Sequence, residues 1–316
     1  MALNRFIVLG RVGMDLYADP PGTRIEAALR FTAAIGGSAG NIAVALARQG
    51  AGAVLLTCVS DDAIGRYCLA ELARYGVGTA HVRSVDGEAR NSLAVVETRP
   101  TDAQSVLYRN GAADFALSLA DVSGVDCSDA AALVVTGTAL AREPSRGAVF
   151  AAMEAARAAD ALVVLDIDYR ACSWMSEAEA AQVCRDAAGR ADIVIGNDDE
   201  FGLMAGTHGE GRALAQALAH RGALFTVYKR GALGSVTFTP DFSFETGIFA
   251  VKALKPMGAG DGFMGGLLAG LGRGLTLENA VRRGAATAAL IVAGIGCAPA
   301  SPDLASLDRF IDSHRP

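Results

Sequence analysis

Residues 255–268 read KPMGAGDGFMGGLL, a glycine-rich turn and one carboxylate followed by a run of small and apolar residues. The apolar run predicts a helix that packs tightly against another element. Gly258, Ala259 and Gly260 leave backbone N–H groups bare at the positive end of that helix, which is typical of an anion site. Asp261, in the first turn, could then take a proton from a hydroxyl that attacks a phosphoryl group. A helix with a plain glycine turn and a simple N-cap remains the alternative.

Outward from this stretch, short β-branched runs alternate with alanine-rich segments along nearly the whole chain. This pattern favours an α/β fold with a mostly parallel sheet and helices on both faces. Since no linker rich in Pro, Gly or Ser divides the sequence, we expect one domain over residues 1–316. The expected strands are 6–9, 54–58, 133–136, 162–166, 193–195, 225–228 and 235–238. The expected helices are 41–49, 64–75, 146–159, 177–188, 210–221 and 261–271.

Two more polar stretches, about residues 12–35 and 88–112, interrupt this rhythm with the alternation typical of strands. We expect them to form a small sheet that projects from the core and acts as a lid. Two copies of the chain could pair through such a sheet, which predicts a homodimer. Two long surface loops are the alternative.

The composition narrows the classes of function. The chain has 316 residues, of which 28 are basic and 34 acidic, so its formal net charge is −6; 52% of residues are hydrophobic. This favours a packed core and argues against broad nucleic-acid binding, which needs a basic face. The six cysteines form no CxxC pair, so free thiols in a reducing compartment are favoured over disulfides or a zinc site. With no signal peptide or membrane span apparent, we expect a cytoplasmic protein.

Two earlier glycine clusters test other classes of site. GRVGMD, at 10–15, lacks the GxGxxG spacing of a dinucleotide site, and a Walker A loop needs a Gly-Lys pair that the chain does not contain. GGSAGN, at 36–41, places Ser38 as in the nucleophile elbow of a hydrolase, but only one core strand precedes it. The other interpretations are a structural turn, or glycines that let the backbone approach a ligand beside the Asn41 amide.

Residues 255–268 and 36–41 resemble the C-terminal and N-terminal signatures of the ribokinase-like (PfkB) carbohydrate kinases. Three segments between them resemble further motifs of that family, in order: SDDAIGR at 60–66 its GDDxxG segment, NDDE at 197–200 its NxxE motif, and KRGALG at 229–234 its KxGxxG motif. Because the five motifs cover nearly the whole chain, we expect the ribokinase-like three-layer sandwich with a β lid.

Finer details resemble the bacterial 5-dehydro-2-deoxygluconokinases of inositol catabolism. The segments that carry this resemblance are MDLYADPPGT (14–23), LYRNGAADFALS (107–118), DIDYR (166–170) and GCAPASP (296–302). A sugar acid as substrate also fits the residues, since a guanidinium is the side chain best suited to a carboxylate. The candidates are Arg109 and Arg170, and a surface salt bridge is the alternative for each of them.

The resemblance implies an ATP-dependent kinase that phosphorylates a primary hydroxyl of a dehydro-deoxy sugar acid, above all 5-dehydro-2-deoxygluconate, with Mg²⁺. It implies Asp261 as general base and the N–H groups of Gly258, Ala259 and Gly260 as ligands of the transferred phosphoryl group. The implied substrate ligands are Asp15, Gly37 and Asn41 for hydroxyls, and Arg109 and Arg170 for the carboxylate. The implied nucleotide ligands are Asn197, Lys229, Gly231 and Gly234, with Glu200 organising Mg²⁺ through water.

Three positions depart from the family pattern. Ser60 stands where a glycine is usual, and Gly262 where alanine is commoner. Lys255 stands where most members have an aspartate whose neighbourhood binds a monovalent cation, and an ammonium there could replace the ion. Potassium activation therefore does not carry over from the resemblance. The rival functions are a 2-dehydro-3-deoxygluconate kinase, a fructokinase-like or nucleoside kinase, and a sugar-sensing protein on a kinase fold.

Overall fold

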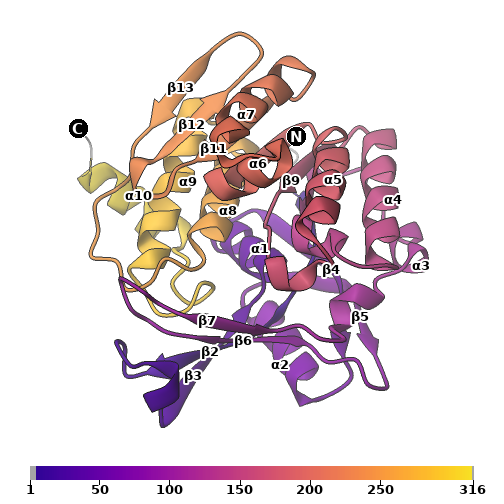
Figure 1. Ribbon diagram of the computed structural model, residues 1–316, viewed down its shortest axis with the longest axis vertical. Coiled ribbons are helices and arrows are strands. Elements are labelled where there is room, and N and C mark those ends of the chain that lie inside the picture. Colours follow the sequence, from indigo (N-terminus) through magenta and orange to yellow (C-terminus); the bar gives the residue numbers. More distant parts are fainter. Residues whose placement is uncertain (1–4, 315–316) are drawn as a thin grey trace.

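A nine-stranded sheet forms the centre of the molecule (Figure 1). The structure is a computed structural model, and it describes residues 5–314. The strand order is β13-β12-β11-β10-β9-β8-β1-β4-β5. Neighbouring strands from β11 to β5 are parallel, and β12 and β13 are antiparallel additions. The strands are β1 (Arg5–Leu9), β4 (Gly52–Ser60), β5 (Gly78–Val85), β8 (Ala132–Thr136), β9 (Leu162–Asp166), β10 (Ile193–Asn197), β11 (Phe225–Lys229), β12 (Ser235–Phe238) and β13 (Ser243–Thr246).

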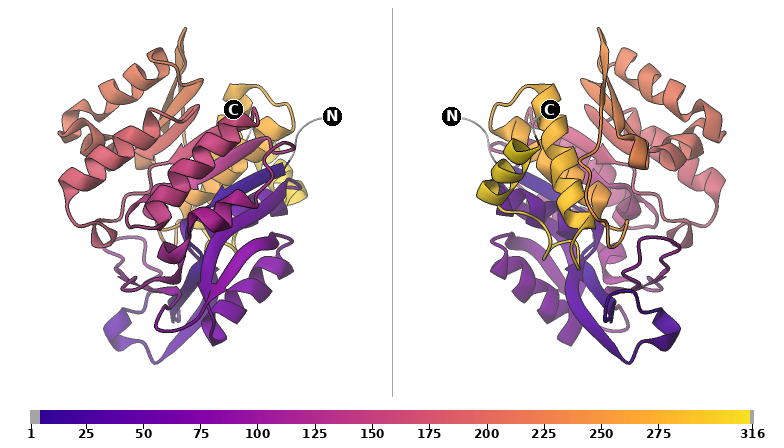
Figure 2. Two further views of the ribbon diagram at one scale, coloured as in Figure 1. Left: turned by 90° about the vertical axis from the view of Figure 1, so that its right-hand side faces the viewer. Right: turned by 90° about the vertical axis from the view of Figure 1, so that its left-hand side faces the viewer.

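Helices cover both faces of this sheet (Figure 2). On one face lie α1 (Ser38–Arg48), α2 (Ala63–Arg74), α8 (Ala259–Gly272) and α9 (Leu277–Val292). On the other lie α3 (Leu119–Ser123), α4 (Ser145–Ala158), α5 (Glu177–Ala188), α6 (Asp198–Ala205) and α7 (Gly211–His220). The last helix, α10 (Leu304–Ser313), packs on α9. The predicted α/β class is confirmed.

The central strands are apolar on both sides because both faces are buried. In β8, Leu133 and Val135 belong to the core under α4 and α5, whereas Val134 belongs to the core under α1 and α8. Ile7 and Val8 of β1 divide in the same way. Unbroken apolar runs of this kind are the mark of a parallel strand covered on both faces, which is why the sequence pattern located these strands.

A separate four-stranded sheet, in the order β3-β2-β6-β7, lies at the bottom of Figure 1. Its strands are β2 (Gly13–Asp19), β3 (Arg30–Gly36), β6 (Ser92–Val96) and β7 (Ser105–Tyr108). They come from the two stretches expected to form a small sheet, so that part of the prediction is confirmed and the loop alternative is wrong. Phe31, Val106 and Tyr108 on this sheet are exposed. Its action as a lid, pairing between copies and the single-domain division stay predictions.

Two helices that carry predicted site residues begin earlier than the sequence predicted. The helix expected from residue 41 begins at Ser38, and the one expected from 261 begins at Ala259. In each case the preceding glycine has a left-handed φ, +87° at Gly37 and +84° at Gly258, so the chain turns one residue ahead of the helix. Edge strand β5 was not predicted, because its half-exposed residues form no apolar run. No helix within residues 5–314 has the length and apolarity needed to span a bilayer.

Candidate active site

The N-terminal turns of α1 and α8 join the two glycine motifs into one site. The Asn41 amide Nδ2 donates a hydrogen bond to Oδ2 of Asp261, at 2.8 Å. The helices approach closely because Gly265 of α8 lies against Ala45 of α1, where a side chain would collide. Residues 220 positions apart in the sequence are therefore in direct contact.

Asp15 of β2 faces the same turn. It is buried, and one of its carboxylate oxygens accepts a hydrogen bond from the Tyr17 hydroxyl at 3.0 Å. Burial raises the pKa of Asp15, against the lowering effect of the Arg11 charge. On the paired strand, a Cβ at Gly36 would overlap the Asp15 carboxylate, so only glycine fits there. The structure thus brings Asp15 beside Gly37 and the start of α1.

The Asp261 carboxylate has the electrostatics of a base that works near neutral pH. Burial, and then the nearby Asp168 carboxylate, raise its pKa to about 6. The Asn41 hydrogen bond and the charges of Arg170 and Arg11 oppose that rise. A general base is most effective when its pKa lies near the working pH, because it is then deprotonated and still basic.

The first turn of α8 offers backbone donors beside a lysine. Gly258, Ala259 and Gly260 stand at the helix start, where backbone N–H groups have no acceptor within the helix. The Lys229 amino group lies alongside, 3.2 Å from the position a Cβ on Gly260 would take. These donors and this charge together suit a phosphate group.

Acidic side chains surround Lys229 at the carboxyl ends of β9, β10 and β11. Its Nζ is 3.8 Å from Oδ1 of Asp166. Burial lowers the pKa of Lys229, but the charges of Asp166 and Glu200 outweigh this and raise it. Burial also raises the pKa of Asp166. Asn197 and Lys229 are partners in the register of β10 and β11, so these two predicted nucleotide residues lie side by side.

Glu200 closes a capping box at the start of α6. Its Oε2 accepts from the Asn197 backbone N–H at 2.7 Å, and Asn197 Oδ1 accepts from the Glu200 N–H at 2.8 Å. Its other oxygen accepts from the Tyr169 N–H at 3.2 Å. The carboxylate is thus oriented by the backbone of two loops, which fits contact with a metal through water rather than by direct ligation. Within residues 5–314 there is no cluster of three or more His, Cys, Asp or Glu residues arranged to hold a metal ion.

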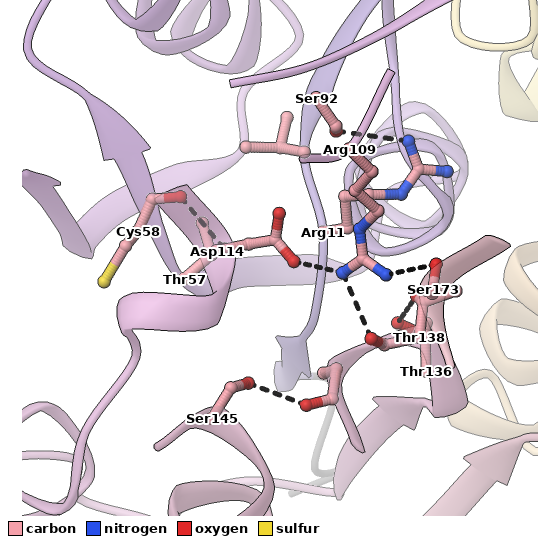
Figure 3. A network of polar contacts seen from close by, with 12 residues as sticks. Arg11, Thr57, Cys58, Ser92, Arg109, Asp114, Thr136, Thr138, Ser145 and Ser173 are labelled. Atoms are coloured by element: carbon pink, nitrogen blue, oxygen red, sulfur yellow. Dashed lines mark hydrogen bonds and ion pairs between the residues drawn. The ribbon is translucent and has the colours of Figure 1, made fainter. Parts of the chain in front are cut away.

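Arg109 and Arg170, the two arginines predicted to bind a carboxylate, belong to one polar network (Figure 3 shows the part around Arg109). Arg109 is buried and forms an ion pair with Asp114, and it donates to Ser173 Oγ at 2.9 Å and to the Thr138 carbonyl at 3.1 Å. The Thr138 hydroxyl in turn donates to Asp168. Asp168 pairs with the half-exposed Arg170 at 3.1 Å. Of the two, Arg170 is the more accessible to a ligand.

Sequence reasoning missed Arg11, which lies next to Arg109 (Figure 3). Its side chain is buried just after β1, and the hydrogen bond it makes is to Ser92 Oγ at 3.3 Å. Its Nε is buried without a partner, and no carboxylate within residues 5–314 lies at ion-pair distance. An arginine inside a glycine turn, directly after a buried strand, is the signal that could have found it.

The remaining predicted residues fall into two places. Gly231 and Gly234 flank the exposed turn between β11 and β12, each with a left-handed φ. Ser38, the hydrolase alternative, lies in the first turn of α1 and contacts the Thr138 hydroxyl at 3.5 Å. Among the described residues no histidine lies within hydrogen-bond distance of Ser38, so the arrangement of a serine hydrolase is missing.

Known proteins resemble this chain over nearly its whole length. Residues 4–304 match the model of the pfkB family of carbohydrate kinases. A 5-dehydro-2-deoxygluconokinase of Photobacterium profundum is 39% identical over 312 residues, covering 97% of this chain and 94% of that protein. One of Geobacillus kaustophilus is 35% identical over 315 residues, covering 98% of this chain and 94% of that protein.

Among solved structures, a fructokinase double mutant of Vibrio cholerae O395, described with fructose, ADP and a potassium ion, is 26% identical. It superposes with a TM-score of 0.84 and covers 98% of both chains. A PfkB protein of Polaromonas sp. JS666 is 29% identical with a TM-score of 0.82, covering 96% of this chain and 99% of that one. The family match over nearly the full length, the fold and the two joined glycine motifs lead to one conclusion: this chain belongs to the pfkB family of carbohydrate kinases, phosphotransferases that act on an alcohol group.

Proposed function

We propose that the chain transfers the γ-phosphoryl group of ATP to the primary hydroxyl of 5-dehydro-2-deoxygluconate, as a kinase of inositol catabolism. The observation that carries the phosphoryl-transfer part is the Asn41–Asp261 hydrogen bond, which fixes a carboxylate of raised pKa in the first turn of α8. The names of the relatives at 35–39% identity support the choice of sugar acid.

The mechanism follows from these positions. The Asp261 carboxylate accepts the proton of the substrate hydroxyl while the hydroxyl oxygen forms a bond to the γ-phosphorus. The bond from phosphorus to the bridging oxygen breaks, and ADP leaves. The N–H groups of Gly258, Ala259 and Gly260 and the Lys229 ammonium stabilise the charge on the transferred group. Bound with the nucleotide, Mg²⁺ would neutralise phosphate charge, and Glu200 would hold it through water.

The substrate lies, in this proposal, between the start of α1 and the small sheet. Asp15, Gly37 and Asn41 bind its hydroxyls, as predicted. Its carboxylate is bound by guanidinium groups, for which Arg11 and Arg170 have the most available donors. Arg109 is paired with Asp114, and its charge lies near enough to that of Arg11 for Arg11 to lower the pKa of Arg109.

The test is ADP release with MgATP against 5-dehydro-2-deoxygluconate, 2-dehydro-3-deoxygluconate, fructose, ribose and adenosine, with Asp261→Asn as the control. We expect activity on the first compound. Activity on the second alone would keep the sugar-acid class and change the substrate. Activity only on a neutral sugar or nucleoside would overturn the carboxylate assignment. No ADP release with any compound, together with measurable sugar binding, would favour a sugar-sensing protein.

A further inference from the structure

Lys255 is a fully buried lysine in the loop that leads into α8. Its ammonium donates to the Met257 carbonyl at 2.7 Å and to the Ile291 carbonyl at 3.3 Å. Within residues 5–314 no carboxylate lies at ion-pair distance from it. A buried charge needs hydrogen-bond partners, and here backbone carbonyls from two separate segments accept from two of the three ammonium protons.

Carbonyl oxygens converging on one positive charge are also the ligands of a potassium ion in proteins. One carbonyl comes from the loop before α8, and the other comes from the last turn of α9, where a cation is favoured by the helix dipole. A second monovalent cation at this point would compete with the ammonium for the same oxygens and would be repelled by it. The residues present therefore do not fit a potassium ion beside Lys255.

The Lys255 ammonium contacts a peptide group at the start of the proposed phosphoryl site. The carbonyl oxygen of Met257 and the N–H of Gly258 belong to one planar peptide group. Lys255 therefore fixes the orientation of the first backbone donor of the proposed phosphoryl site, and it polarises that donor through the amide. The next peptide group is held as well, because the Cys297 thiol donates to the Gly258 carbonyl at 3.6 Å.

We propose that the Lys255 ammonium is a built-in monovalent cation that takes the place of potassium beside the first turn of α8, so that phosphoryl transfer by this chain needs no potassium. Lys255 is then a positioning residue, acting through the Met257–Gly258 peptide. The proposal rests on membership of the kinase family and not on which sugar is the substrate.

The first experiment uses the wild-type protein and no substitution. Turnover and the ADP dissociation constant, the latter by titration calorimetry, are measured in potassium chloride and in choline chloride at equal ionic strength. We expect both quantities to agree within about twofold between the two salts. Activation by potassium of more than about fivefold, or an ADP affinity that falls by as much in choline, would overturn the proposal. The ADP measurement needs no sugar, so it stands even if the proposed substrate fails.

The second experiment removes the charge. Lys255→Met should lower kcat by about tenfold or more in choline, because the Gly258 donor loses its fixed orientation, while the KM of the sugar changes little. Lys255→Ala leaves room for an ion, and added potassium or ammonium should restore part of its turnover. Lys252→Met, in the same loop but exposed, is the matched control and should behave as the wild type. Full turnover of Lys255→Met in choline would contradict the proposal, and so would a loss in Lys255→Ala that neither ion restores while its ADP affinity is retained.

Discussion

The segment around Arg109, after β7, and the turn around Arg11, after β1, lie side by side and each bury a guanidinium, but they treat it differently. Arg109 has an acidic partner, a hydroxyl and a carbonyl, and so is largely satisfied within the protein. Among the described residues, Arg11 has one long hydrogen bond, to the Ser92 hydroxyl. The Nε of each arginine is buried without a partner, so the difference lies in the terminal nitrogens. Arg109 lies in the segment that resembles the kinase family, yet Arg11 is the arginine with more donors left without a partner.

The largest expected effect belongs to Asp261, whose pKa the charge of Arg11 lowers. Asp261→Asn should lower kcat by about 10²–10⁴-fold, because the amide cannot accept the substrate proton. ADP binding, measured by calorimetry, should be retained, since the amide oxygen can still accept from Asn41. Turnover near the wild-type level would remove Asp261 from the mechanism, and with it the reason to place a substrate beside Arg11.

Next comes Arg109. Arg109→Met should destabilise the fold by about 3–5 kcal/mol, because Asp114 would be left as a buried charge without its partner. The measurement is chemical denaturation with ADP absent. Arg109→Met with Asp114→Leu in the same chain should recover part of the loss. A single variant as stable as the wild type, with a raised KM for the sugar acid, would show Arg109 to be a substrate ligand as the sequence predicted and would erase the contrast with Arg11.

Arg11 should show the reverse pattern. Arg11→Gln should raise the KM of the sugar acid by about 10- to 100-fold, the loss of a charge-assisted hydrogen bond worth about 1.5–3 kcal/mol. Stability should change less than in Arg109→Met, since no buried carboxylate loses an ion pair. Arg74→Gln, an exposed arginine paired with Glu71, is the control. An unchanged KM in Arg11→Gln would mean that the carboxylate is bound elsewhere or that the substrate is neutral.

The smallest expected effect is on the pH dependence of the rate, which should differ between variants of Arg11 and variants of Arg109. The rate should fall as pH drops through about 6, because Asp261 becomes protonated below its pKa and can no longer act as a base. The positive charge of Arg11 lowers the pKa of Asp261, so Arg11→Gln should move this acidic limb of kcat/KM to higher pH. Arg109 is not among the main groups that shift the pKa of Asp261, so any Arg109 variant that folds should leave the limb nearly in place. A shift in the Arg109 variant instead would reverse the assignment.

The sequence by itself determined the class of the fold, the family and the position of Asp261. Parallel strands buried on both faces are apolar throughout, and the glycine motifs need particular residues at fixed spacing because the backbone turns sharply there. Both are local properties, visible in a few consecutive residues. The starts of α1 and α8 were placed two or three residues late, since a glycine with positive φ is not distinguished in sequence from one inside a helix.

Only the tertiary structure decided what each buried charge contacts. Asn41 and Asp261 are hydrogen-bonded although they lie 220 positions apart in the sequence. Arg109 pairs with Asp114, whereas Arg11 pairs with no acid among the described residues. The Lys255 ammonium donates to backbone carbonyls of two separate segments. The free energy of a buried charge depends on the few atoms within hydrogen-bond distance and on the removal of water. Both are set by how distant segments pack, and no stretch of the sequence contains that information.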